Sequence, residues 1–249
     1  MISLATTALL VAAGAFGGAI NSVAGGGSFI VFPSILLAGV PPVAANASTA
    51  VALWPAGVAS TIAYRDDLPS ERVTLLVLGL ASAIGGTAGA VLLLSTSDKT
   101  FTKVLPLLMF AASAVFTIGP RVSKLRPGAR MPLALAAVVQ VLIASYGGYF
   151  GGGMGIMMLA TFTLMGMTHL HSMNGLKALL STVINGVANI AFFVAHKVVL
   201  EVAAPVALGA ILGGWLGASI ARKVAPARVR VVVLGFAWAL TAWFAFKAL

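Results

Sequence analysis

The chain has no cysteine and very little charge. Its 249 residues contain no Cys, and Asp, Glu, Lys and Arg together make up 8% of them, against about 25% in a soluble globular domain. The absence of cysteine excludes disulfides, thiolate metal sites and a cysteine nucleophile. The scarcity of charge, together with 60% hydrophobic residues and a mean hydropathy of +1.09, indicates an integral membrane protein in contact with a lipid bilayer.

Acidic residues are the scarcest charged group. The chain has five of them, which are Asp66, Asp67, Glu71, Asp98 and Glu201. All five fall in or beside predicted loops, so we expect no carboxylate in the membrane interior. This argues against a cation held by an acidic ligand and against a carboxylate proton relay.

Motifs for catalysis and for cofactors are also absent. The sequence contains no GxSxG, no HExxH, no P-loop and no GxGxxG. We therefore expect no enzyme activity, no cofactor and no metal site. The net charge of +10 does not indicate nucleic acid as a partner, because the basic residues cluster in short loops beside apolar spans, where they orient a membrane protein.

Two of the apolar segments are too long for single helices. A span needs about 20 residues, and the predicted segments are 4–39, 45–64, 73–95, 102–119, 132–168, 173–196, 202–221 and 229–247. The N-terminus "MISLATTALL" lacks the basic region of a signal peptide, so we expect it to be a retained span. The first and fifth segments each carry a Gly-Gly-Gly triplet, which disfavours an unbroken helix.

The sequence is duplicated. The triplet in "NSVAGGGSFIVFPS" matches the triplet in "YGGYFGGGMGIMML", Asn46 falls near Asn174, and "GGTAGA" from Gly85 matches "GGWLGA" from Gly213. These landmarks keep an offset of between about 126 and 129 residues, which predicts two structural repeats. We expect an N-terminal repeat over 1–120, a basic linker over 121–130 and a C-terminal repeat over 131–249.

The charge distribution predicts how the repeats are oriented. The segments 121–130 and 222–230 each carry four basic residues and no acidic one, so both are expected in the cytoplasm. They can share that side only if the broken fifth segment folds back as a hairpin. The predicted fold is therefore an all-α membrane protein of two inverted repeats and about eight hydrophobic segments, with broken or hairpin helices at the triplets and both termini outside.

A helix that stops inside a membrane leaves backbone groups without partners, and these must face protein or a watery cavity. The helices that restart after the triplets would offer free N–H groups and partial positive charge, which suit an anion. Paired breaks in inverted repeats indicate a substrate site. The alternative is that the glycines only allow close helix packing, which is the role we expect for Gly85/Gly89 and Gly213/Gly217.

Polar residues near the breaks complete the candidate site. Asn174, Lys177, Ser181 and Asn185 follow helical spacing and share one face. Lys177 either lines the site or lies near the membrane surface with its amine at the headgroups; His169, His171 and His196 are either structural or proton carriers. The predicted substrate-binding residues are Asn21, Ser22, Gly25, Gly26, Gly27, Ser28, Asn46, Thr49, Gly151, Gly152, Gly153, Met154, Asn174, Lys177 and Asn185.

The first repeat, "NSVAGGGSFIVFPSILLAGVPPVAANAST", and its weaker copy, "FGGGMGIMMLATFTLMGMTHLHSMNGLKA", resemble the sulfite exporter TauE/SafE family over essentially the whole chain. The resemblance implies transport of small sulfur-containing anions across a bacterial inner membrane. The copy departs from the first repeat, with Met154 in place of Ser28 and Leu159 in place of Pro33.

The polar breaks and the absence of interior carboxylates favour a secondary transporter of a small oxyanion that works by alternating access, and the family resemblance implies that it exports sulfite, sulfoacetate, another organosulfonate or a thiosulfate-like anion. An anion channel and a membrane assembly factor without transport activity stay open as alternatives. The expected partners are the small anionic substrate and the lipid bilayer. Coupling to protons or other ions, the direction of transport and the oligomeric state are left open by the sequence.

Overall fold

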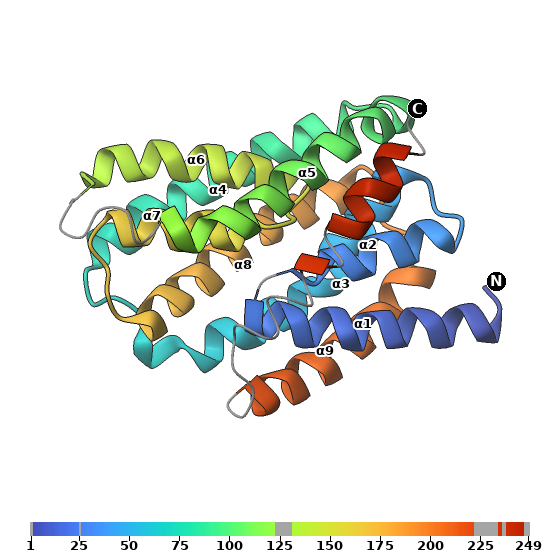
Figure 1. The fold of residues 1–249 in the computed structure, drawn as a ribbon, viewed down its shortest axis with the longest axis horizontal. Helices are drawn as coiled ribbons and strands as arrows, with labels where there is room; N and C mark the ends of the chain where they lie inside the picture. Colours follow the sequence, from blue (N-terminus) through green and yellow to red (C-terminus); the bar gives the residue numbers. More distant parts are fainter. Residues whose placement is uncertain (1, 25, 123–130, 222–233, 236–237, 247–249) are drawn as a thin grey trace.

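The computed structural model describes residues 2–24, 26–122, 131–221, 234–235 and 238–246, and within them the ordered elements are all helical. The helices are α1 (Leu4–Ala24), α2 (Ser28–Leu37), α3 (Pro42–Ala63), a 3-10 turn η1 (Arg65–Asp67), α4 (Arg72–Leu94), α5 (Asp98–Val122), α6 (Leu133–Tyr149), α7 (Met154–Leu164), α8 (Leu170–Val194) and α9 (Leu200–Ala221). Residues 238–246 form a further helical stretch. The helices lie roughly along the long axis of the molecule (Figure 1).

The exposed surface of these helices is apolar. Three described stretches, Leu4–Asn21, Arg72–Leu94 and Leu170–Val194, are long and hydrophobic enough to cross a membrane. Large side chains such as Phe16, Leu76 and Ile190 are about two-thirds exposed. In water such an apolar surface would be unfavourable, whereas lipid tails solvate it. The chain is therefore a multi-pass membrane protein, and the ordered elements of its described part are helical.

The helical path is interrupted at both glycine triplets. One helix ends at Ala24 and the next begins at Ser28; farther along, a helix ends at Tyr149 and the next begins at Met154. In the second interruption Gly151 and Gly153 both have φ of +81°, which only glycine adopts without strain. The amide of Met131, just before α6, donates to the carbonyl of Leu164 at 2.8 Å, so the start of α6 and the end of α7 lie together.

The tightest packing joins helices from the two halves of the sequence. α1 packs along α9, and α4 packs along α6. A side chain at Gly213 would collide with the backbone of Ala15, and one at Gly89 would collide with the backbone of Ser145. The prediction that glycines of these two motifs allow close helix packing is thus confirmed for Gly89 and Gly213.

Two hydrogen bonds join positions that are one repeat apart. The indole nitrogen of Trp54 on α3 donates to the carbonyl oxygen of Thr182 on α8 at 3.0 Å, and the hydroxyls of Ser113 and Thr241 lie 3.2 Å apart. Each pair is separated by 128 residues, which falls in the range of offsets, about 126 to 129 residues, between the repeated sequence landmarks.

Candidate functional site

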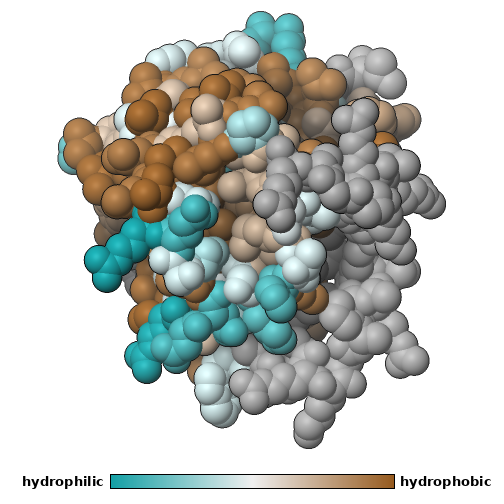
Figure 2. All heavy atoms as spheres, turned by 90° about the vertical axis from the view of Figure 1, so that its left-hand side faces the viewer, coloured by the Kyte–Doolittle hydropathy of each residue, from teal (hydrophilic) through white to brown (hydrophobic). Residues whose placement is uncertain are grey.

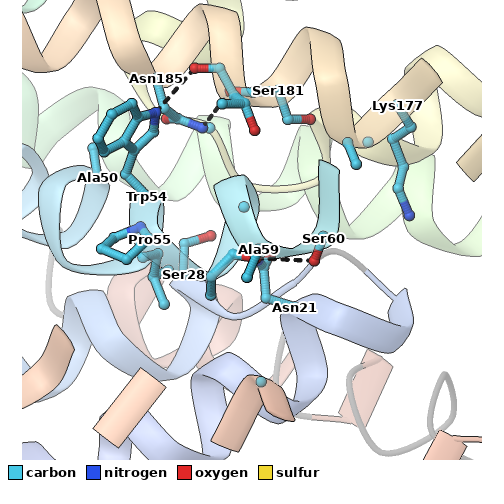
Figure 3. Close-up of a pocket in the computed structure, with 18 of the residues that line it drawn as sticks. Asn21, Ser28, Ala50, Trp54, Pro55, Ala59, Ser60, Lys177, Ser181 and Asn185 are labelled. Atoms are coloured by element: carbon cyan, nitrogen blue, oxygen red, sulfur yellow. Dashed lines mark hydrogen bonds between the residues drawn. The ribbon is translucent and has the colours of Figure 1, made fainter. Parts of the chain in front are cut away.

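A cavity of about 1150 Å³ lies between α3 and α8 and extends to α1, α2, the second glycine interruption and α9. Figure 3 shows Lys177, Ser181 and Asn185 along α8, facing Trp54, Ala59 and Ser60 on α3, with Asn21 and Ser28 on the far side of α3. This volume is slightly above the range of about 300–1,000 Å³ that is ordinary for small-molecule sites. The cavity is the candidate substrate site.

The cavity opens at one end of the molecule. Its lining there includes Tyr64 and Asp67, which follow α3, and Leu170 and His171 at the start of α8. Asp67, Leu170 and His171 are exposed, and the rings of Tyr64 and His171 lie 6.5 Å apart. Figure 1 places the end of α3 and the starts of α6 and α8 together at the left, and Figure 2 shows hydrophilic residues gathered on that face.

The opposite end of the cavity is closed. Asn46 and Thr49, at the start of α3, are 5% and 2% exposed. Phe150 lines the cavity beside them, and its ring packs edge-on against that of Phe32, with centroids 6.0 Å apart. Phe32 in turn packs against Phe101 and Phe244. The buried aromatic residues seal this end against water.

Nine of the predicted site residues line the cavity: Asn21, Ser28, Asn46, Thr49, Gly151, Met154, Asn174, Lys177 and Asn185. Four glycines, Gly26, Gly27, Gly152 and Gly153, lie in or beside the interruptions but do not line it. Of the remaining two, Gly25 lies outside the described residues, and Ser22 is in α1 but its side chain is not described.

The hydrogen bonds separate the lining side chains into two groups. Several already donate to backbone carbonyls: the Asn46 amide to Tyr149 at 2.9 Å, the Thr49 hydroxyl to Ala45 at 2.8 Å and the Asn185 amide to Ser181 at 2.9 Å. The second group is Asn21, Ser28 and Ser181, whose side chains make no hydrogen bond within the described part of the chain, so their donors are available to a ligand.

Lys177 is in the cavity wall on α8. Its ammonium nitrogen lies 3.1 Å from the Asn174 side-chain oxygen, to which it donates, and the side chain is half-buried. An ammonium has three donors, so two are left for other partners. The Asn174 amide nitrogen makes no hydrogen bond within the described residues. Together these groups provide a positive charge and amide N–H donors in one part of the cavity.

Sequence reasoning missed some of the lining. Ser60 and Trp54 line the cavity from α3, and continuing the helical spacing from Asn46 and Thr49 would have found Ser60. Asp67, expected in or beside a loop, is the last residue of the 3-10 turn η1 and lines the mouth of the cavity. No local feature of the sequence indicates this, because the fold alone brings η1 beside the start of α8.

Comparisons with known proteins agree with a transport function. A family profile described as "Sulfite exporter TauE/SafE" matches residues 10–244. A Sinorhizobium protein named "Probable membrane transporter protein ORF9" is 30% identical over 224 residues, which cover 89% of this chain and 84% of the relative. A Haemophilus influenzae protein named "Probable membrane transporter protein" is 25% identical over 234 residues, covering 93% and 90%.

A third relative matches a smaller part of the chain. "Probable membrane transporter protein YfcA" of Escherichia coli K12 is 27% identical over 152 residues, covering 60% of this chain and 56% of that protein. No solved structure gives a significant match.

Proposed function

Because this chain belongs to the sulfite exporter TauE/SafE family and is a membrane transporter, we propose that it moves a small sulfur-containing oxyanion across the bacterial inner membrane, in the direction of export. Sulfite, sulfoacetate, another organosulfonate and a thiosulfate-like anion are the candidate substrates. Each presents several oxygen acceptors and a negative charge, so each requires N–H or O–H donors and a cation in the site.

One observation carries this proposal: side-chain donors without partners and a lysine line the same cavity. Asn21 and Ser28 flank the first interruption, and Asn174, Lys177 and Ser181 follow one face of α8. Hydrogen bonds to a charged partner contribute about 1.5–3 kcal/mol each. Several of them would offset much of the cost of removing water from a small anion. The proposal assigns substrate contact to these five residues.

The charges of the cavity also favour an anion. Among the described lining residues, Asp67 is the acidic one, and it is exposed at the mouth, whereas Lys177 is half-buried. A carboxylate in water is strongly screened, while a partly buried ammonium retains more of its attraction for an anion. The volume of about 1150 Å³ leaves room for an organosulfonate as well as for sulfite.

Alternating access between two inverted repeats, 1–120 and 131–249, joined by the linker 121–130, is the proposed mechanism. The pairing of α1 with α9 and of α4 with α6 supports it, because exchanging the two repeats turns one pair into the other. The contact between Met131 and Leu164 supports a hairpin at the second triplet. In the proposed topology the open end of the cavity faces the cytoplasm, which is the side from which an exporter takes up its substrate.

Transport by purified protein in liposomes tests the proposed function. We expect saturable flux of radiolabelled sulfite or sulfoacetate, and no flux of sodium or choline. Flux that rises linearly with concentration would favour the anion channel instead. If none of the anions moves, with and without a pH gradient, the proposal is wrong and the assembly-factor alternative gains support.

A further inference from the structure

A single side-chain hydrogen bond joins the start of α3 to the second glycine interruption. The Asn46 side-chain amide donates to the carbonyl oxygen of Tyr149, the last residue of α6, at 2.9 Å. Both residues are buried, with exposed fractions of 5% and 9%. A carbonyl at the end of an interrupted helix lacks its usual amide partner, and Asn46 supplies one at the closed end of the cavity.

The repeat counterpart of Asn46, which is Asn174, makes different hydrogen bonds. Asn174 lies 128 residues later, near the start of α8, and it lines the open end of the cavity. Its oxygen accepts a hydrogen bond from Lys177, and its amide nitrogen has no partner among the described residues. Asn21, in the last turn of α1 before the first triplet, lines the same cavity. The contact that closes one end is therefore not made at the other.

We infer that Asn46 and Asn174 are paired positioning residues, each of which closes one end of the cavity by donating to the helix end at the interruption in the opposite repeat. In the structure, Asn46 holds the closed end of the cavity, which is the outer end because the proposed topology turns the open end towards the cytoplasm. When the inner end closes, Asn174 donates to a carbonyl in the last turn of α1, and Asn46 releases Tyr149. This inference rests on the proposed alternating access, because inverted repeats exchange conformations as the cavity changes sides.

The exchange is chemically balanced. One amide-to-carbonyl hydrogen bond breaks at the end that opens and one forms at the end that closes. At the open end, cavity water supplies hydrogen bonds to the released groups. The two end states therefore keep the same number of satisfied polar groups, and removing one amide shifts the equilibrium towards the state that the other amide stabilises.

Cysteine accessibility in the full-length protein tests this directly, since the chain has no native cysteine. A cysteine at Ala178, a cavity-lining residue, is labelled by a membrane-impermeant maleimide from either side of oriented vesicles. With Asn46→Asp, which is similar in shape and whose ionised carboxylate cannot donate, we expect the ratio of inner to outer labelling to fall by about tenfold, the ratio that 1.4 kcal/mol produces. With Asn174→Asp we expect the ratio to rise.

Two comparisons make the result specific. Asn46→Ala and Asn174→Ala repeat the test without an added charge and should shift the ratio in the same opposed directions. Asn189→Ala removes a buried amide from α8 outside the cavity and should leave the ratio unchanged. The inference would be overturned if the Asn46 and Asn174 variants shifted the labelling ratio in the same direction, or if the folded variants left it unchanged. If the parent protein transports anions but the Asn46 and Asn174 variants leave the labelling ratio unchanged, the pairing of Asn46 with Asn174 is wrong and the proposed function still stands.

Discussion

The phenol hydroxyl of Tyr146 donates to the carbonyl oxygen of Gly152 at 2.7 Å, across the second interruption. Together with the bond from Asn46 to Tyr149, it fixes a loop in which Gly151 and Gly153 have positive φ. The second triplet is thus held by side chains from two helices, α3 and α6. It contributes Gly151 to the cavity wall, between Phe150 and Met154, whereas Asn21 and Ser28 flank the first triplet.

Removing the Tyr146 hydroxyl should destabilise the protein. Tyr146→Phe leaves the buried Gly152 carbonyl without this donor, and we expect the free energy of unfolding to fall by about 1–3 kcal/mol. Thermal unfolding in detergent measures this. Tyr149→Phe is the matched control, because the Tyr149 hydroxyl makes only a 3.5 Å contact with Thr96 and its loss should have little effect. Equal effects of the two changes would contradict the special role of Tyr146.

Glycines on α4 should differ sharply in their tolerance of a side chain. A Cβ at Gly89 would collide with the backbone of Ser145 on α6, whereas a Cβ at Gly79 would meet nothing within 4 Å. We expect Gly89→Ala to lower the free energy of unfolding by about 1–3 kcal/mol or more, as overpacking does. Gly79→Ala should be neutral or stabilise the helix by up to about 1 kcal/mol. Denaturation of both variants checks this, and similar values would show that α4 and α6 pack less closely.

The proposed topology places both basic segments in the cytoplasm. The segments 121–130 and 222–230 lie outside the residues that the structure describes, so labelling is the direct test. Cysteines at Ser123 and Ala227 should react from the cytoplasmic side, and a cysteine at Thr100, which is exposed in the first turn of α5, should react from the other side. Reaction of the first two from opposite sides would refute the inverted repeat.

Local features of the fold could be predicted from the sequence, because they depend on short-range chemistry. Four polar residues at helical spacing, from Asn174 to Asn185, do share the cavity-facing side of α8. The glycine triplets indicated where the long apolar segments would be interrupted, and helices do end at Ala24 and Tyr149. Whether these interruptions form membrane hairpins around a substrate remains a prediction.

Long-range features could not be predicted in the same way. The sequence contains no local signal that α1 packs on α9 or that Asp67 reaches the cavity, because both depend on how distant helices come together. Asn46 illustrates the difference. Its polarity suggested a substrate contact, whereas the structure places its amide on the Tyr149 carbonyl, and only the fold brings those two residues together.

Lys177 is the group on which the account of the substrate most depends. Lys177→Met keeps the aliphatic stem and removes the charge. The matched control is Lys99→Met, because Lys99 is exposed near the start of α5 and its loss changes the net charge equally. Lys177→Arg should restore binding only in part, since a guanidinium is larger and planar.

The most direct test is the affinity of the purified protein for sulfite and sulfoacetate, measured by calorimetry for the parent chain and these three variants. We predict that Lys177→Met weakens anion binding tenfold or more, which is about 1.4 kcal/mol or greater, while Lys99→Met leaves it unchanged. Unchanged affinity in folded Lys177→Met, or tight binding of a cation in place of an anion, would contradict the account.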